Sequence, residues 1–379
     1  MFALKPRTEI AGRVLLSVVI LFHALVPTGA TAKASQKPTA TTGSTEQSNN
    51  PLRQINIRDG FASILESGKS LFSIQEKDPF IVNSTDDSSD SDVADGVCDD
   101  GSGMCMLRAA IEQANANPGR DTIIFDLPGE GPYTIQPLLP LPVIDDPLVI
   151  DATTQPGYAG APLVVLDGSL AGEEAHGLQI AAGGSVVRGL VINQFGYSGI
   201  RLEGKGGVLV EGNYIGTDPT GTIAQGNRIG ILVDNTSGNS IGGTRDEARN
   251  LISGNLIGIY VYGRTAKSNK IHGNRIGADA SGKKIVGNDI GIRIDDASGN
   301  SVGGKGIGKM DNLIVGNSDN VHVHGEAALG NQIQADILDE QPTISPAIIL
   351  DDMPTHRSTD SLKEVPSLPQ ETPAPISRT

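Results

Sequence analysis

The middle of the chain contains short segments in which apolar residues alternate with glycine, polar or charged residues. The clearest examples are 229–233, 257–261 and 290–294, which follow one another at intervals of about 30 residues. An alternation with a period of two residues is typical of β-strands that bury one face. The sequence therefore predicts a succession of short, regularly spaced strands.

An internal repeat covers these strands. Shifting the chain by 61 residues aligns 212–243 with 273–304, and 18 of the 32 paired positions are identical. Half of this period is also visible in a series of asparagines at intervals of 30, 31 and 31 residues: Asn239, Asn269, Asn300 and Asn331. A second series follows glycine each time: Asn227, Asn255, Asn288 and Asn317. About 30 residues with several strands fit one coil of a parallel β-helix.

We therefore expect an all-β fold, a right-handed parallel β-helix (a single-stranded solenoid) over residues 120–338, with a short N-terminal capping helix. Stacked asparagines about 4.8 Å apart can hydrogen-bond along the stack, so the first asparagine series is the predicted ladder at one corner. A leucine-rich repeat would need its Leu-x-x-Leu-x-Leu pattern. A propeller would need Trp-Asp or aromatic marks in each blade. Neither pattern is present.

Composition agrees with a frequently turning fold that packs small aliphatic residues. Glycine accounts for 48 of 379 residues, aromatics for only 3%, and Trp is absent. The net charge of −15 argues against nucleic acid and against an anionic membrane surface as partners, because phosphate binding needs clustered Lys and Arg.

The N-terminus has the pattern of an export signal. Three basic residues precede a short apolar run over 14–26, and Ala30-Thr31-Ala32 fits a small-x-small cleavage site. The run is too short for a spanning helix, so we expect residues 1–32 to be removed and no membrane span to remain. The mature chain is expected to be secreted, extracellular or periplasmic, with attachment to the cell surface as an alternative. Residues 33–78 resemble a linker or short pro-region, and 339–379 a Pro-rich disordered tail.

Residues 79–119 form a different block, which we interpret as an N-terminal cap. Its two cysteines are the only ones in the chain, and export would place them in an oxidising compartment. We therefore expect Cys98 and Cys105 to form a disulfide. The stretch that follows has helical spacing of its apolar residues and is expected to seal the first coil, because an uncovered coil would expose unpaired strand edges.

Several phrases of the chain resemble a known family. Residues 105–110 read Cys-Met-Leu-Arg-Ala-Ala, 151–158 read Asp-Ala-Thr-Thr-Gln-Pro-Gly-Tyr, and 215–222 read Ile-Gly-Thr-Asp-Pro-Thr-Gly-Thr. These are similar to phrases of bacterial exported β-helix proteins with an N-terminal Cys-Ser-Leu-Arg-Glu-Ala box, although Met106 and Ala109 replace the Ser and Glu of that box. The resemblance implies a pectate-lyase-like superhelix over about 79–335, with its N-terminal end covered by the box helix. It implies little chemistry.

Alternation along the repeated strands predicts which residues face outward. If Ile231, Ile259 and Ile292 face inward with their equivalents, two outward columns share one sheet. The candidate ligand-binding residues in these columns are Arg201, Glu203, Asp234, Tyr260, Tyr262, Arg293, Asp295, His322 and His324. The face is either a surface for an extended polysaccharide or peptide, or an ordinary solvated face with ion pairs between coils.

Catalysis on this face has little support in the sequence. Asp234 and Asp295 lie two coils apart, about 10 Å by strand spacing, which is slightly beyond the roughly 6.5–9.5 Å of an inverting hydrolase. Arg293 beside Asp295 is a weak match to the Arg base and carboxylates of a lyase. We therefore assign no catalytic residue.

Metal chemistry has weak signals only. His322 and His324 lie on one strand face at a spacing that can hold zinc with Asp295 as a third ligand, but two exposed histidines are the simpler interpretation. The loop at 86–100 holds seven aspartates. Its spacing is out of register with an EF-hand, so a solvated acidic loop is favoured, with weak Ca²⁺ binding as the alternative. We expect no metal site and no cofactor.

Two functions follow from these patterns. The first is a monomeric, exported binding or adhesive module, directed at an extracellular polysaccharide or other glycan. The second is a carbohydrate-active enzyme, a polysaccharide lyase or hydrolase, that uses the outward face of the repeats. The missing catalytic signatures favour the first.

Overall fold

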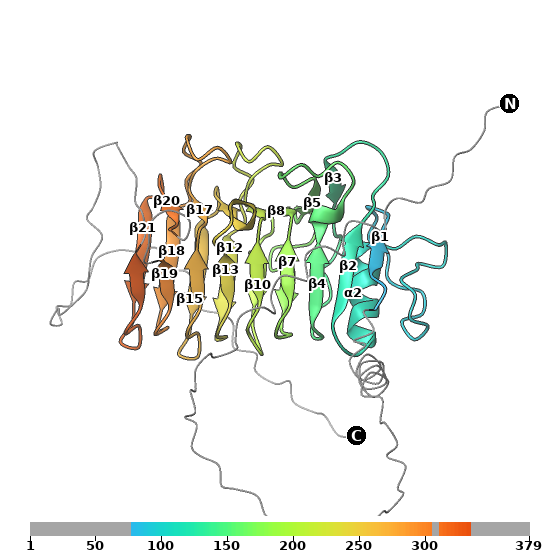
Figure 1. Cartoon of the computed structure of the whole chain (residues 1–379), viewed down its shortest axis with the longest axis horizontal. Helices are drawn as coiled ribbons and strands as arrows, with labels where there is room; N and C mark the ends of the chain where they lie inside the picture. Colours follow the sequence, from blue (N-terminus) through green and yellow to red (C-terminus); the bar gives the residue numbers. More distant parts are fainter. Residues whose placement is uncertain (1–76, 305–310, 335–379) are drawn as a thin grey trace, which may run out of the picture. The chain divides into compact units, whose positions relative to one another are not determined.

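The computed structural model describes residues 77–304 and 311–334. The predicted signal peptide, the predicted C-terminal tail and nearly all of the predicted linker lie outside the described residues (Figure 1). Within the described residues, no helix has the length and apolar character needed to cross a membrane.

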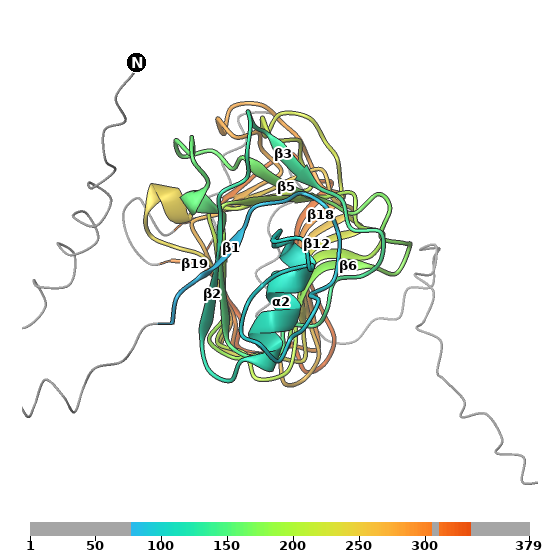
Figure 2. The ribbon, with the colours of Figure 1, turned by 90° about the vertical axis from the view of Figure 1, so that its right-hand side faces the viewer.

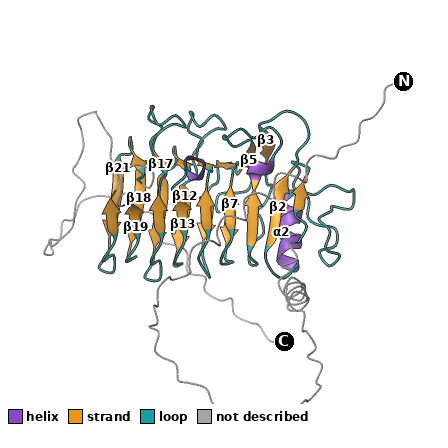
Figure 3. Ribbon diagram, viewed as in Figure 1, coloured by secondary structure: helices purple, strands orange, loops and turns teal. Residues whose placement is uncertain are grey.

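Three sheets contain all the named strands, and every pair of neighbouring strands is parallel (Figure 3). The nine-stranded sheet contains β1 (Phe80–Val82), β2 (Asp121–Phe125), β4 (Leu148–Asp151), β7 (Val186–Arg188), β10 (Leu209–Glu211), β13 (Ser240–Gly242), β16 (Lys270–His272), β19 (Ser301–Gly303) and β22 (Gln332–Gln334). The seven-stranded sheet contains β3 (Tyr133–Ile135), β5 (Val164–Asp167), β8 (Leu190–Asn193), β11 (Tyr214–Ile215), β14 (Leu251–Ile252), β17 (Arg275–Ile276) and β20 (Leu313–Ile314). The six-stranded sheet contains β6 (His176–Ile180), β9 (Ser198–Leu202), β12 (Ile229–Asp234), β15 (Ile257–Tyr262), β18 (Ile290–Asp295) and β21 (Asp319–His324).

From β4 onward the chain visits the three sheets in turn and then starts the next coil, so the fold is the predicted parallel β-helix. Each return to the same sheet is a parallel crossover, for which a right-handed sense is strongly preferred. The helical elements are α2 (Leu107–Ala116) and two short 3₁₀ turns, η1 (Ala152–Thr154) and η2 (Asp246–Ala248). β1, which the sequence analysis assigned to the cap, is the first strand of the nine-stranded sheet and pairs with β2.

The 61-residue repeat covers two coils with different connections. Long connections run from β11 to β12 and from β13 to β14, whereas the next two turns, from β14 to β15 and from β16 to β17, are short. The long connections then return between β17 and β18. The long loops 216–226 and 277–287 are built alike, because Asp218 and Asp279 each accept backbone N–H groups from the far side of their own loop.

Aliphatic side chains from successive coils stack in the interior. The central positions of the six-stranded sheet pair in register from coil to coil. Ile200 pairs with Ile231, Ile231 with Ile259, and Ile259 with Ile292, and all four side chains are fully buried. Val321 continues the column in the last described coil but is only partly buried. Burial of this apolar column is the main favourable term for stacking the coils.

The asparagines predicted to stack at one corner form a continuous hydrogen-bonded column. The side-chain Nδ2 of Asn239 donates to Oδ1 of Asn269 at 2.9 Å, and Asn269 donates in the same way to Asn300 at 2.9 Å. Asn300 then donates to Oδ1 of Asn331 at 3.2 Å. Each backbone N–H in the column also donates to the same Oδ1 of the next coil.

Each of the three corners has such a ladder. The corner before the six-stranded sheet contains the second asparagine series of the sequence analysis, Asn227, Asn255, Asn288 and Asn317. The corner before the seven-stranded sheet contains a third ladder, which the sequence analysis missed: Asn213, Asn250, Asn274 and Asn312. Because most of these amides are buried, the ladders supply the partners without which each would cost free energy.

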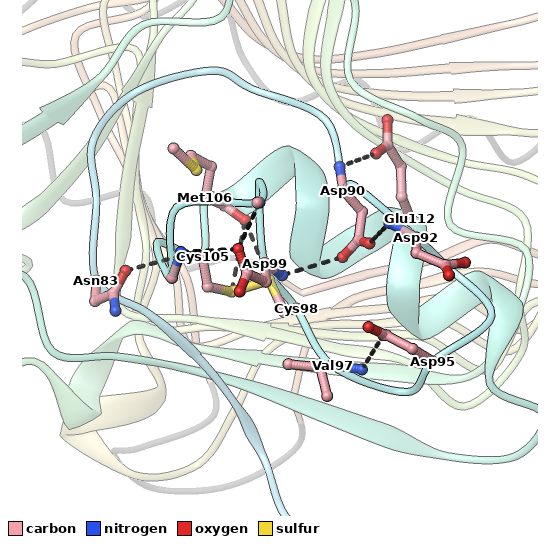
Figure 4. The surroundings of a disulfide bond; sticks show 12 residues. Asn83, Asp90, Asp92, Asp95, Val97, Cys98, Asp99, Cys105, Met106 and Glu112 are labelled. Carbon is pink, nitrogen blue, oxygen red and sulfur yellow. Dashed lines mark hydrogen bonds between the residues drawn. A yellow bond between two sulfur atoms is a disulfide. The ribbon is translucent and has the colours of Figure 1, made fainter.

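The N-terminal end of the coil is covered by α2. Figure 2 shows this helix at the end of the coil, beside the first strands, β1 and β2. Its apolar side is buried, with Leu107 1% and Ile111 0% exposed. The predicted disulfide between Cys98 and Cys105 is present and closes the six-residue loop in front of the helix (Figure 4).

Arg108, the arginine of the Cys-Met-Leu-Arg-Ala-Ala box, ties this cap to the coil. Its guanidinium binds both carboxylate oxygens of Asp87 at 2.9 Å and donates to the carbonyl oxygens of Leu139 and Pro140. Arg108 is itself buried. Arg108 therefore has a structural role, because it joins the acidic loop, α2 and the turn after β3.

Asn269→Leu should lower the free energy of unfolding by about 1–3 kcal/mol, because the donors of Asn239 lose their acceptor in a buried corner. Urea denaturation of the two proteins measures the difference. Lys267→Leu, at an exposed position of the same turn, is the matched control and should change stability by less than about 0.5 kcal/mol. Equal losses in both variants would contradict a role for the ladder.

Leu107→Asp places a carboxylate where α2 meets the end of the core. We expect it to lower stability by at least about 3 kcal/mol and to promote aggregation, because burial of an unpaired charge adds to the lost packing. Thermal unfolding and light scattering measure both effects. An unchanged melting temperature would show that α2 does not cap the coil.

Candidate functional site

The structure brings the nine predicted surface residues together on the outer face of the six-stranded sheet. In one column Arg201 pairs in register with Leu232, which is followed by Tyr260, Arg293 and His322. In the next column Asp234 is followed by Tyr262, Asp295 and His324. Glu203 directly follows β9 and carries the second column one coil further. We call these nine residues the outer face.

At the N-terminal half of the outer face, one arginine pairs with two carboxylates. The Nη2 atom of Arg201 lies 2.7 Å from Asp234 on the next coil and 3.1 Å from Glu203. Gln179, on the preceding coil, donates from Nε2 to Glu203 at 2.7 Å. Both carboxylates thus share the single guanidinium of Arg201, and the amide of Gln179 adds a neutral hydrogen bond to Glu203.

A second node forms around Asp295. Its Oδ2 accepts from Arg293 Nε at 2.8 Å and from the hydroxyl of Tyr260 at 2.9 Å, while Arg293 Nη2 lies 2.6 Å away. The guanidinium of Arg293 also lies over the ring of Tyr260, 5.2 Å from its centroid. Burial and the Asp295 carboxylate raise the pKa of the Tyr260 hydroxyl. The hydrogen bond to Asp295 raises the pKa of Arg293, so the guanidinium stays charged.

Tyr262 is the most accessible aromatic ring of the outer face. It is 43% exposed, and its centroid lies 5.8 Å from that of Tyr260 with a tilt of 52°. The two rings form a paired aromatic surface, as alternation predicts. Tyr260 is fixed by its hydrogen bond to Asp295 and by the guanidinium of Arg293 over its ring, whereas the ring of Tyr262 is exposed to solvent.

The two histidines complete the C-terminal end of the outer face. The rings of His322 and His324 are nearly parallel, with centroids 6.5 Å apart, and Nδ1 of His322 lies 3.0 Å from Asp319 Oδ2. Among residues 77–304 and 311–334, no three His, Cys, Asp or Glu side chains are close enough to hold a metal. Asp295 therefore does not complete a zinc site with the two histidines.

His176 extends the outer face by one coil, and sequence reasoning missed it. Its Nδ1 lies 2.6 Å from Ser198 Oγ, its Nε2 lies 3.4 Å from Arg201 Nη1, and its ring packs edge-on against Tyr197 at 5.0 Å. Burial, and then the charge of Arg201, lowers the pKa of His176 to about 4. His176 precedes the recognisable repeats, and strict alternation along β6 would place it on the inner face with Leu178, so the strand period could not have indicated it.

A small apolar cluster, separate from the core, lies beside these residues. It consists of Ile229, Leu232 and Ile257, with Tyr197, Tyr260 and Ile290 packed against it. Leu232 lies in the outward column between Arg201 and Tyr260, and it is buried because it belongs to this cluster. The cluster packs against the ring of Tyr260.

The acidic loop at 86–100 uses its carboxylates on its own backbone (Figure 4). Asp90 accepts from the N–H of Asp92, Asp92 from that of Ala94, and Asp95 from that of Val97. These short-range bonds stabilise the turns of the loop. Weak Ca²⁺ binding by the loop stays a prediction.

Another charged cluster follows the outer side of the nine-stranded sheet. Arg188 Nη2 lies 2.6 Å from Asp151, its register neighbour, and Nη1 lies 3.7 Å from Glu211 on the next coil. Arg245, from the loop that contains η2, approaches Glu211 at 3.4 Å. This sheet repeats the pattern of the outer face, in which an arginine joins acidic groups of adjacent coils.

Comparisons with known proteins give little further information. No family model and no curated protein sequence matches the chain. A crystal structure to which the chain is similar is that of pectate lyase Pel9A, with 15% sequence identity over 71% of this chain and 80% of that one, and a TM-score of 0.26. The description of the fold therefore rests on the strand pairing of this chain.

The depressed pKa of His176 predicts a pH-dependent stability. Because its pKa is about 4 in the folded chain and about 6.5 when unfolded, the unfolded chain binds the extra proton first as pH falls. Stability should be complete above about pH 6.5 and decrease toward pH 4. After allowance for partial exposure, the loss from this group is about 1–2 kcal/mol.

Urea denaturation of the wild type and of His176→Gln between about pH 7 and about pH 4 tests this effect. All other titratable groups are the same in both proteins, so the difference between the two curves isolates His176. A difference that is constant over this range would contradict the depressed pKa.

Proposed function

We propose that the protein is an exported binding module and that its outer face binds a neutral glycan. The observation that supports this most directly is the exposed ring of Tyr262 beside Tyr260, on a flat parallel sheet with polar groups on both sides. Sugar rings present apolar C–H faces and peripheral hydroxyls, which match an aromatic ring flanked by hydrogen-bonding groups.

The polar groups around the tyrosines are held in place before any ligand arrives. Arg293 is oriented by Asp295 and by the ring of Tyr260. His322 and His324 occupy the next coil, where each imidazole can donate to or accept from a hydroxyl. Preorganised groups lose little conformational entropy on binding, which favours a binding role for this face.

A neutral ligand fits the charges better than a polyanion. The chain has a net charge of −15, so an acidic polysaccharide would be repelled unless local cations outweighed that charge. The two arginines of the outer face are already bound to carboxylates at 2.6–3.1 Å. A uronate would have to compete with these carboxylates for the same guanidinium groups.

The same ion pairs make catalysis the weaker alternative. A lyase needs a base that loses its proton, but Asp295 raises the pKa of Arg293 and holds it protonated. A hydrolase needs two carboxylates facing one bond, whereas Tyr262 lies in register between Asp234 and Asp295. A polysaccharide lyase or hydrolase remains the second candidate function.

We further propose that the mature chain acts outside the cytoplasm as a monomer, either secreted or held at the cell surface. The signal-like N-terminus supports export, and the cysteine bridge supports an oxidising compartment. The resemblance to exported proteins with a Cys-Ser-Leu-Arg-Glu-Ala box points the same way. It rests on the quoted phrases and on the position of α2.

A glycan array probed with the mature protein tests the proposal. For a neutral glycan that binds, Tyr262→Ala should weaken binding at least about fivefold, because a ring–ring contact contributes roughly 1 kcal/mol. Tyr158→Ala, which removes a partly buried tyrosine from another surface, is the matched control and should leave affinity unchanged.

Two results would contradict the proposal. Binding of the Tyr262→Ala variant within twofold of wild type, with an unchanged melting temperature, would move the site away from the outer face. Release of reducing ends or unsaturated products from any bound glycan, lost in Asp295→Asn, would establish the enzyme instead.

A further inference from the structure

The carboxylate of Asp295 uses only one of its two oxygens within the outer face. The hydroxyl of Tyr260 and the Nε and Nη2 atoms of Arg293 all converge on Oδ2, at 2.6–2.9 Å. Asp295 is 7% exposed, and its Oδ1 is buried without a hydrogen-bond partner among the described residues. No other carboxylate oxygen in the described part of the chain is both buried and unpartnered in this way.

The neighbouring carboxylates of the outer face use both oxygens. Asp234 accepts from Arg201 at Oδ2 and from Asn235 at Oδ1. Glu203 pairs with Arg201 through Oε2 and accepts an amide donor at Oε1. Because a buried acceptor without a donor is costly, proteins rarely leave one unpaired. The exception at Asp295 therefore indicates an acceptor that is completed by a donor from outside the described residues.

Asp295 lies next to the aromatic ring that is best placed to contact a sugar. In the register of the six-stranded sheet, Tyr262 precedes Asp295 by one coil and His324 follows it by one coil. Neighbouring coils are about 4.8 Å apart, so a sugar ring stacked on Tyr262 brings its peripheral hydroxyls to Asp295. Arg293 uses Nε and Nη2 on Asp295, which leaves Nη1 as a further donor beside the same position.

The side chains on both sides of Asp295 are free to move. Tyr262 is 43% exposed, and its hydroxyl forms no hydrogen bond with a described residue, in contrast to the hydroxyl of Tyr260, which is bound to Asp295. His324 is exposed as well. Rotation of an exposed side chain costs far less than a change in the sheet, because the ladder hydrogen bonds of the backbone stay intact.

We propose that Oδ1 of Asp295 accepts a hydrogen bond from a hydroxyl group of the glycan, and that Nη1 of Arg293 donates to the adjacent hydroxyl. The ring of Tyr262 turns aside to admit the first hydroxyl and then stacks on the same sugar. Hydrogen bonds to a carboxylate are stronger and more directional than stacking, so this pair of contacts selects sugars that have two neighbouring hydroxyls. The assignment rests on the proposed function and specifies the chemistry of its ligand.

Titration of the mature protein with cellohexaose, xylohexaose and mannohexaose tests the assignment. For each of these that binds, Asp295→Asn should weaken binding at least about fivefold. Its amide keeps one oxygen for Tyr260 and Arg293 but replaces the second acceptor by an NH₂ group. Asp151→Asn is the matched control, because it alters an equally buried carboxylate that pairs with Arg188 on the nine-stranded sheet, and it should leave affinity within about twofold.

O-methylation of the same oligosaccharides gives a second measurement that needs no change in the protein. It should weaken binding to wild type at least about fivefold, and the loss should be smaller in Asp295→Asn, because the methylated sugar no longer has the donor that Asp295 accepts.

Three results would overturn the assignment. They are equal binding of the free and O-methylated sugars by wild type, equal binding of the free sugars by wild type and Asp295→Asn, and no binding of any of the three. Weaker binding by Tyr262→Ala in the second case, or binding of another neutral glycan on the array in the third, would leave the proposed function in place.

Discussion

Pairing of buried amides at the corners is the constraint on which this β-helix depends. A flat strand satisfies its backbone through the neighbouring coil, but each corner turns the backbone away from that pattern and buries it. The ladder asparagine supplies partners for both the N–H and the C=O groups buried at the corner. Its Oδ1 accepts two donors of the preceding coil, and its Nδ2 donates to an earlier carbonyl. A residue without this amide would leave buried donors unpaired, at a cost comparable to the net gain from several hydrogen bonds.

The same constraint determines the local backbone. Gly216 has a positive φ of 91°, and a Cβ on it would overlap the side chain of the ladder residue Asn255. Glycine is required at this position because the turn passes directly beside the side-chain amide of Asn255 and leaves no room for a Cβ. Because three ladders repeat this arrangement, successive coils stay in register, and a slip of one residue would lose all three.

Fixed register explains the chemistry of the surface. Residues at equivalent positions of adjacent coils lie within reach of each other, so opposite charges pair between coils, as Arg201 does with Asp234 and Arg188 with Asp151. The outer face therefore has cations and carboxylates that pair between coils, although Asp295 Oδ1 and Arg201 Nε are buried without a hydrogen-bond partner among the described residues. Beside these pairs lie the exposed ring of Tyr262 and the imidazoles of His322 and His324.

These relations also decide what the sequence could predict. The ladder from Asn239 to Asn331 was visible because its spacing is nearly constant, and the disulfide followed from cysteine count and export. The ladder from Asn213 to Asn312 was missed, since alternating long and short loops space it at 37, 24 and 38 residues. Alternation placed the outer columns but not the cluster of Ile229 and Ile257, which strict alternation would put on the inner face with Ile231.

The ladders also have a direction that no period reveals. Their first acceptors take backbone N–H groups of Leu190, Phe195 and Val208. Within each ladder, Oδ1 always accepts from the preceding coil, although Nδ2 also donates backward to an earlier carbonyl. A coil with such a polarity needs chemically different closures at its two ends, and an apolar helix serves only at the end where the ladders present acceptors.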